Sequence, residues 1–182
     1  STWTKVTNPT RTQGHPFVIE VLNDGSLVAS YSARKPTSSL AFTASSGVFY
    51  STDNGTTWAD RSDALMQNYT KDVVIDPSDN TQRTWYATGF SACGSGPPAN
   101  SGGLYKTTNK GVSWTKISNS YRVNSCTINP ANTNELYFTT ETDGLWYSNN
   151  IKNTTPTFQR VTAYPFRSPD RVFFNPYKSS EI

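Results

Sequence analysis

The stretch STDNGTTW at Ser51–Trp58 returns with its spacing intact as TTNKGVSW at Thr107–Trp114. In both copies Ser or Thr, Asp or Asn, Gly and Trp occupy the first, third, fifth and eighth positions. A pentapeptide with a leading glycine overlaps the start of each copy, GVFYS at 47–51 and GLYKT at 103–107. A third pentapeptide, GLWYS at 144–148, leads into a degenerate copy that ends at Phe158. The chain is therefore built from an internal repeat, and this periodicity has to be established before the fold is assigned.

A second phrase precedes each hairpin and keeps step with the first. VVIDP at 73–77 leads to WYAT at 85–88, CTINP at 126–130 leads to LYFT at 136–139, and VFFNP at 172–176 begins a further round. Strand-forming residues on both sides of an Asx-Pro turn are typical of two strands joined by a polar loop. One repeat therefore holds four strands, A and B around the Asx-Pro turn and C and D around the Asp/Asn-x-Gly turn. The first repeat replaces the Asx-Pro turn with NDGS at 23–26.

Short antiparallel strands in repeating groups of four, with no long segment of helical period, predict an all-β chain made of β-propeller blades. We expect complete four-stranded blades at about residues 15–60, 69–118 and 121–163, and partial blades at residues 1–6 and 167–182. Propellers close with about 4 to 8 blades. The 182 residues are therefore expected to form a single partial propeller, taken from a larger protein or from a ring shared between chains.

The Ser-x-Asp-x-Gly-x-x-Trp phrase resembles the Asp-box, or BNR repeat, of sialidases, sortilin-like receptors and family-74 glycoside hydrolases. Its pairing with the Gly-aromatic pentapeptide and the Asx-Pro turn is most similar to the family-74 xyloglucanases. That resemblance implies a secreted protein that binds or processes polysaccharide of the xyloglucan or β-glucan class. Asp-boxes also occur in receptors and assembly factors, so a non-catalytic propeller that binds a protein or peptide partner is the alternative.

The repeated residues themselves have a predicted structural role. Hydroxyl and carboxylate or amide oxygens accept hydrogen bonds from backbone NH groups of the turn, glycine permits a positive φ angle, and tryptophan supplies a large apolar anchor between sheets. The two sets are Ser51, Asp53, Gly55 and Trp58, and Thr107, Asn109, Gly111 and Trp114.

Composition excludes several classes of partner. Hydrophobic residues make up 34% of the chain and charged residues 16%, and the formal net charge is +3 with no basic run longer than two residues. Binding to nucleic acid or to a membrane surface through charge is therefore not expected. The sequence is rich in Thr, Ser and Asn, which favours a secreted or periplasmic location.

No cofactor or metal is expected. His15 is the only histidine and precedes a proline, which argues against a His-based metal site or a Ser-His-Asp relay. The segment GSGPP at 94–98 lacks the lysine of a phosphate-binding loop. The two cysteines, Cys93 and Cys126, allow either one disulfide or two free thiols, and the sequence leaves both open.

The resemblance implies that A–B and C–D turns share one face of the propeller, while B–C loops and D–A connections line the opposite, ligand-binding face, which we call the loop face. Aromatic rings that can stack on sugars, with hydrogen-bond donors beside them, suit a glycan groove there. The alternative is that these are ordinary solvated loop residues. The predicted ligand-binding residues are Tyr69, Phe90, Tyr121, Arg122 and Tyr164.

Three acids adjoin equivalent loops and are the catalytic candidates: Asp72, Glu141 and Asp170. Glycoside hydrolysis uses two carboxyl groups about 5 to 5.5 Å apart for retention or about 6.5 to 9.5 Å apart for inversion. In family-74 enzymes the two acids come from separate propellers, so the resemblance implies that this chain supplies at most one and is inactive alone. The alternative is that each acid is solvated or ion-paired. Self-association of two copies that complete a ring is a further expectation.

Overall fold

The computed structural model describes residues 2–13, 15–33, 43–91, 100–120, 122–178 and 181–182. In this part of the chain the strands form three sheets, and the one helix is a single 3-10 turn, η1 (Ala64–Gln67). The first sheet contains β1 (Pro16–Val21), β2 (Leu27–Tyr31), β3 (Gly47–Ser51) and β4 (Ala59–Asp60). The second contains β5 (Thr70–Ile75), β6 (Trp85–Gly89), β7 (Gly103–Thr107) and β8 (Thr115–Ser118). The third contains β9 (Val123–Ile128), β10 (Leu136–Thr140), β11 (Gly144–Ser148) and β12 (Gln159–Arg160).

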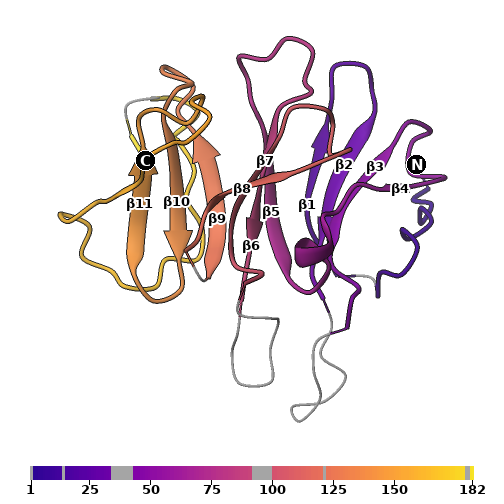
Figure 1. The fold of residues 1–182 in the computed structure, drawn as a ribbon. Coiled ribbons are helices and arrows are strands. Elements are labelled where there is room, and N and C mark those ends of the chain that lie inside the picture. Colours follow the sequence, from indigo (N-terminus) through magenta and orange to yellow (C-terminus); the bar gives the residue numbers. More distant parts are fainter. Residues whose placement is uncertain (1, 14, 34–42, 92–99, 121, 179–180) are drawn as a thin grey trace.

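Each sheet is a simple antiparallel meander in which strands consecutive in sequence are hydrogen-bonded neighbours. The sheets stand side by side like the blades of a fan (Figure 1), and β5 contacts both β1 and β9, so the first strands of the blades lie closest together. The expected all-β architecture with three complete four-stranded antiparallel blades is confirmed.

The turns sort onto two edges as expected. The loops after β1, β5 and β9 leave the sheets at the top of Figure 1, and the connections after β2, β6 and β10 leave at the bottom. The bottom edge is therefore the loop face.

Side chains close the first C–D turn. Ser51 Oγ donates to Asp53 Oδ1 (2.8 Å) and accepts from the Gly55 amide (2.9 Å), while Asp53 Oδ1 also accepts from the Thr57 amide (2.8 Å). Gly55 has a φ of 82°, which favours glycine. The repeated Ser, Asp and Gly are thus the residues that satisfy the backbone of a tight turn.

The second C–D turn repeats this network atom for atom. Thr107 Oγ1 donates to Asn109 Oδ1 (2.8 Å) and accepts from the Gly111 amide (3.1 Å), and Asn109 Oδ1 accepts from the Ser113 amide (3.0 Å). In the degenerate third turn, Asn150 Oδ1 likewise accepts from the Thr157 amide (2.9 Å).

The tryptophans of these turns tie each blade to the segment before it. Trp114 Nε1 donates to the Arg61 carbonyl (2.6 Å), and Trp58 Nε1 donates to the Thr7 carbonyl (2.9 Å). A Cβ added to Gly111 would lie 2.8 Å from Arg61 Cβ, so glycine also permits this close approach. Residue 7 therefore contacts the first blade as residue 61 contacts the second.

The inner strands carry a second repeated link. Ser30 Oγ of β2 donates to the Lys71 carbonyl of the next blade (2.8 Å), and Thr139 Oγ1 of β10 donates to the Asp170 carbonyl (3.3 Å). The Val172 amide then donates to Ser125 Oγ of β9 (3.4 Å). Residues 170–172 therefore contact the third blade in the same way as the first residues of β5 contact the first blade.

Neither terminal segment forms a strand, although the sequence pattern predicts partial blades there. Residues 2–9 have no regular structure, and the C-terminal segment has one isolated bridge, between Asn175 and Lys178. A strand needs a hydrogen-bonded neighbour along its edge. The C-terminal segment instead meets the third blade through separate contacts such as the Gly144 amide to the Arg167 carbonyl (2.8 Å), and residues 2–8 are exposed.

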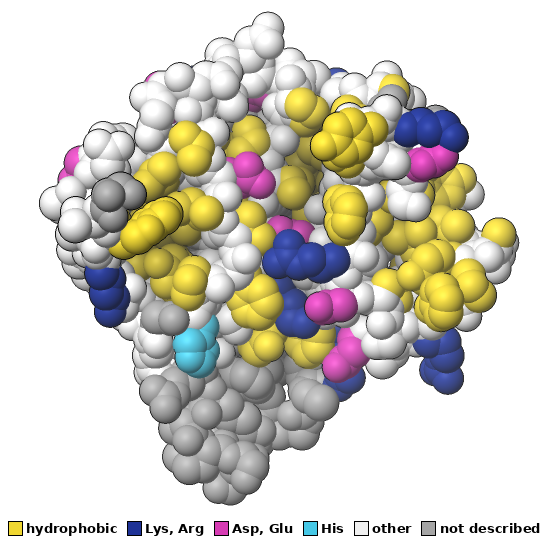
Figure 2. All heavy atoms as spheres, turned by 180° about the vertical axis from the view of Figure 1, so that it is seen from behind, with side chains coloured by type: hydrophobic (Ala, Val, Ile, Leu, Met, Phe, Trp, Pro, Cys, Tyr) yellow, Lys and Arg dark blue, Asp and Glu magenta, His cyan; other side chains and the backbone are white. Residues whose placement is uncertain are grey.

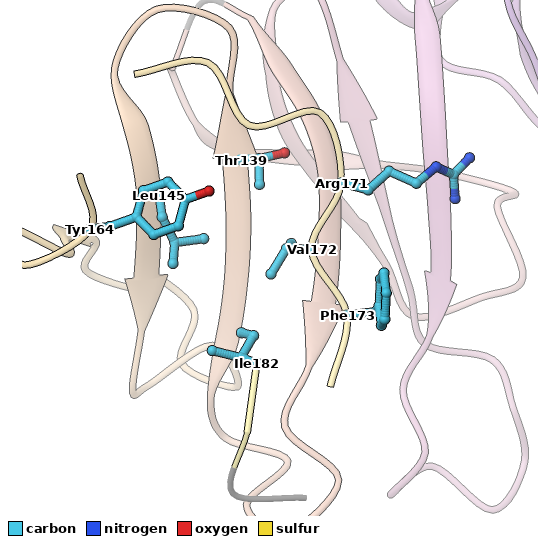
Figure 3. Close-up of a pocket in the computed structure, with 7 residues that line it drawn as sticks. All are labelled: Thr139, Leu145, Tyr164, Arg171, Val172, Phe173 and Ile182. Carbon is cyan, nitrogen blue, oxygen red and sulfur yellow. The ribbon is translucent and has the colours of Figure 1, made fainter. Parts of the chain in front are cut away.

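The C-terminal segment and the third sheet enclose an apolar pocket of about 260 Å³, lined by Thr139, Leu145, Tyr164, Arg171, Val172, Phe173 and Ile182. Figure 3 shows Arg171 pointing out of this pocket toward the neighbouring strands. Its Nη2 lies 3.5 Å from the Phe17 carbonyl of β1, so the segment also touches the first blade.

Two apolar clusters fill the spaces between the sheets. Between the first and second sheets lie Leu22, Val28, Val48, Met66, Val73, Trp85, Ala87 and Tyr105. The second cluster, around the second and third sheets, contains Tyr86, Leu104, Val123, Cys126, Ile128, Leu136, Phe138 and Ile151. Cys126 is a free, buried thiol, and Cys93 lies outside the described residues.

Trp114→Ala should lower the free energy of unfolding by about 2 to 3 kcal/mol, because it removes both the bond to Arg61 and the apolar anchor of the second blade. Trp3→Ala is the matched control, since Trp3 is fully exposed. Urea titration of the two variants measures the difference. Equal stability of the variants would contradict the anchoring role.

Tyr86→Phe should raise the free energy of unfolding by about 1 kcal/mol. The Tyr86 side chain is completely buried, its hydroxyl has no hydrogen-bond partner among the described residues, and an unsatisfied buried hydroxyl costs about 1 to 3 kcal/mol. Thermal melts of Tyr86→Phe beside Tyr137→Phe, a tyrosine of the outer sheet face, test this. A clear loss of stability in Tyr86→Phe would show that the hydroxyl is bonded.

Candidate functional site

A lysine at the start of β5 organises part of the loop face. Lys71 Nζ donates to Asn124 Oδ1 (2.7 Å) and lies 4.6 Å from the centroid of the Phe90 ring. The Arg122 guanidinium lies 5.8 Å from the same ring, and the Tyr69 ring is 5.1 Å away. Phe90 is only 9% exposed. Its ring therefore holds two cations in place instead of offering a surface to a ligand.

Two of the three candidate acids face this lysine. Burial lowers the pKa of Lys71, and the negative charges of Asp170 and Glu141 oppose that shift. Glu141 also forms an ion pair with Arg122. Figure 2 shows basic and acidic side chains gathered near the middle of the face opposite that of Figure 1, with hydrophobic side chains on either side. Glu141 is thus ion-paired, whereas Asp170 is exposed and acts on Lys71 through its charge.

Asp72, the third candidate acid, lies inside β5 and is 7% exposed. Its Oδ1 accepts from the Val73 amide (3.0 Å) and its Oδ2 from the Cys126 amide of the next blade (3.1 Å). Burial raises the pKa of Asp72, and hydrogen bonds from Ser125 and the two amides oppose the increase. The carboxyl group therefore joins two blades at their inner strands.

A polar pocket of about 320 Å³ opens beside the tight turn between β10 and β11. Its lining is Ser120, Arg122, Thr140, Thr142, Asp143, Trp146 and Arg167. Backbone hydrogen bonds to neighbouring segments hold the turn. The Glu141 amide donates to the Arg122 carbonyl (2.9 Å), and the Gly144 amide donates to the Arg167 carbonyl (2.8 Å). We call this cavity the Trp146 pocket.

Trp146 is only partly buried here because its blade differs from the other two. The equivalent positions Phe49 and Tyr105 pair with Ala29 and Ala87 and are completely or almost completely buried. Trp146 pairs instead with Phe138 and stacks on it, with ring planes 12° apart and centroids 6.3 Å apart.

The connection before Trp146 also explains its exposure. It spans only residues 141–143, whereas the corresponding connections of the other blades span 32–46 and 90–102. The Tyr105 hydroxyl donates to the Ser101 carbonyl, which lies within the connection 90–102 (2.7 Å). Because the third connection is short, the indole lines an open pocket.

The predicted ligand-binding residues fall into two groups. Tyr69, Phe90 and Arg122 lie together around Lys71, and Arg122 also lines the Trp146 pocket. Tyr164 lines the separate apolar pocket under the C-terminal segment. Tyr121 lies outside the described residues. The predicted groove residues thus do not share one cavity.

Sequence reasoning missed Trp146 and Arg160. Trp146 was read only as a strand residue of the repeated pentapeptide, and Arg160 lies in β12, where its Nη1 is 3.6 Å from Asp143 Oδ1. The signal was present in the sequence: the third pentapeptide follows its preceding strand after three residues, so no long loop is available to cover its aromatic ring.

The described residues contain no group of three or more His, Cys, Asp or Glu able to hold a metal ion. Nor does any helix among them have the length and apolar character needed to cross a membrane.

The sequence matches no protein-family model and no curated protein. Among solved structures, an ancestral enzyme of glycoside hydrolase family 74 aligns with 80% of this chain at a TM-score of 0.53 and 18% identity. The family-74 xyloglucanase from Xanthomonas campestris aligns with 80% of the chain at a TM-score of 0.53 and 15% identity. The chain spans 18% and 23% of the lengths of these proteins. At this identity the likeness shows a shared fold, that of β-propeller blades found in glycoside hydrolases.

The contribution of Asp72 to the free energy of unfolding should fall as pH rises. A carboxyl group whose pKa is raised in the folded state contributes its full stabilisation below the pKa of the unfolded chain, 3.8. That stabilisation is lost as the pH rises through the pKa of the folded state. Asp24 has the opposite sign: a hydrogen bond from Ser26 lowers its pKa to about 2, so its contribution is lost as pH falls from 3.8 toward 2.

Urea titrations of Asp72→Asn between pH 4 and 7 should therefore show stability that rises more with pH than in the wild type. Asp24→Asn serves as the matched control, with its difference confined to lower pH. Parallel pH profiles for Asp72→Asn and the wild type would rule out a raised pKa at Asp72.

Proposed function

We propose that this chain is part of a secreted Asp-box β-propeller that binds polysaccharide of the xyloglucan or β-glucan class on its loop face. The observation that carries the proposal is the Trp146 pocket, which places a partly buried indole beside arginine, hydroxyl and carboxylate groups. A flat apolar ring flanked by a few convergent polar groups suits the apolar face and the hydroxyls of a sugar.

The Asp-box assignment rests on the matching C–D turns. In both, the first residue accepts from the glycine amide, and the third residue accepts from the amide four positions on. The tryptophan at the eighth position then bonds to the preceding segment. In this assignment Asp53 and Asn109 stabilise the turns and take no part in ligand binding.

Binding without hydrolysis is the activity we propose for the chain alone. Glu141 is paired with Arg122, Asp143 with Arg160, and Asp72 is buried against backbone amides. Asp170 is exposed and lies near Lys71. An acid and a second carboxylate on opposite sides of one sugar, as glycoside hydrolysis requires, would need a group from elsewhere in a larger enzyme.

A second candidate function is a scaffold that binds a protein partner or another copy of the chain. The observation that favours it is a row of apolar side chains on β1: Phe17, Ile19 and Val21 are 41%, 59% and 67% exposed. Solution scattering that gives a monomer at high concentration would count against a second copy.

Trp146→Leu should weaken binding of cello-oligosaccharides and xyloglucan oligosaccharides about tenfold, because leucine preserves an apolar contact with Phe138 but offers no flat ring to a sugar; a tenfold loss corresponds to about 1.4 kcal/mol. Trp3→Leu, at a fully exposed position, is the matched control. Titration calorimetry measures the affinities, and a reducing-sugar assay should detect no cleavage.

Unchanged affinity in Trp146→Leu would remove the pocket from the binding surface. Release of reducing ends by the isolated chain would contradict the proposal that it binds without hydrolysis.

A further inference from the structure

The charges around the Trp146 pocket do not balance. Three arginines lie around the turn between β10 and β11, Arg122, Arg160 and Arg167, against the two carboxylates of Glu141 and Asp143. One positive charge is therefore left over at the mouth of a cavity that already has an aromatic wall.

The leftover charge can be assigned to one residue. Arg122 forms an ion pair with Glu141, and Arg160 Nη1 lies 3.6 Å from Asp143 Oδ1. Arg167 lines the pocket, yet its guanidinium forms no ion pair within the described part of the chain. Its backbone is held in place, since its carbonyl accepts from the Gly144 amide (2.8 Å). A fixed backbone with an uncommitted guanidinium is suited to receiving an anion.

The geometry of the arginine side chain selects the kind of anion. A guanidinium offers parallel N–H donors that match the two oxygens of a carboxylate, whereas a neutral hydroxyl engages only one of them. The indole of Trp146 lies in the same pocket and suits the apolar face of a sugar. The volume of about 320 Å³ is at the lower end of the range for small-molecule sites, which suits a single sugar unit.

We propose that the Trp146 pocket binds a sugar unit that carries a carboxylate, a hexuronic acid residue within an oligosaccharide, with the carboxylate on Arg167 and the ring against Trp146. This inference rests on the proposed glycan-binding function and extends it to acidic glycans, because it makes a negative charge on the sugar the feature that the pocket selects. Asp143, held by Arg160, remains available to accept from a sugar hydroxyl.

The test compares two ligands that differ only at C6: cellotriose and the trisaccharide in which each C6 hydroxymethyl group is oxidised to a carboxylate. Titration calorimetry at pH 7 should show about tenfold tighter binding of the oxidised trisaccharide by the wild type, in line with one charge-assisted contact. The preference should shrink at high salt, because the exposed ion pair is screened.

Arg167→Gln should bind the two trisaccharides with equal affinity, because the carboxylate then has no guanidinium to contact. Arg83→Gln is the matched control, since Arg83 is also exposed and follows β5 on the opposite edge of the blades. This control should keep the full preference. Thermal melts check that both variants are folded, as expected for exposed side chains.

The outcomes separate the two proposals. Equal affinity of the wild type for the two ligands, or equal loss of the preference in Arg167→Gln and Arg83→Gln, would overturn the carboxylate site and leave glycan binding standing. Failure of both trisaccharides and of the xyloglucan oligosaccharides to bind would overturn the proposed function, and this inference with it.

Discussion

The blades of this protein depend on hydrogen bonds that join one sheet to the next at two depths. Near the centre, strand side chains bond to the backbone of the following blade, as Ser30 does to Lys71 and Asp72 to Cys126. At the periphery, the turn tryptophans bond back to the preceding segment, as Trp114 does to Arg61. A single four-stranded sheet buries little apolar surface alone, so stacking of neighbouring units supplies the core. These bonds fix how the neighbours stack.

Because of that constraint, the residues that stabilise the fold are separate from those available to a ligand. The residues that repeat most faithfully hold turns and inter-blade contacts, and the Asp53 carboxylate among them accepts from the Thr57 amide and from the Ser51 and Thr57 hydroxyls. The chemistry available to a ligand lies where the repeat is irregular. The third blade shortens its B–C connection to residues 141–143 and replaces an alanine by Phe138, and these two changes together leave Trp146 only partly buried. A departure from the repeat thus creates the pocket.

The sequence predicted more of the fold than of the site. Strand register and turn chemistry depend on residues that are close in sequence, so the Asx-Pro turns, the Asp/Asn-x-Gly turns and the alternating strands could all be predicted from the sequence. The site was less legible because burial depends on what covers a side chain. Phe90 was expected to stack on sugars, but Lys71 and Arg122 cover its ring, and Asp72 was expected to adjoin a ligand-binding loop but lies buried within β5. The sequence pattern predicted Trp146 only as a strand residue, not as part of a pocket.

The sequence by itself determined the repeat, the all-β fold, the order of strands in each blade and the two edges on which the turns lie, because all of these follow from short-range spacing and the geometry of tight turns. Only the tertiary structure decided which rings are covered, which acids are paired and which arginine is left without a carboxylate. Those outcomes depend on contacts such as Arg122 with Glu141 and Lys71 with Asn124, whose partners come from different strands or different blades. The spacing of residues along the chain does not predict such contacts.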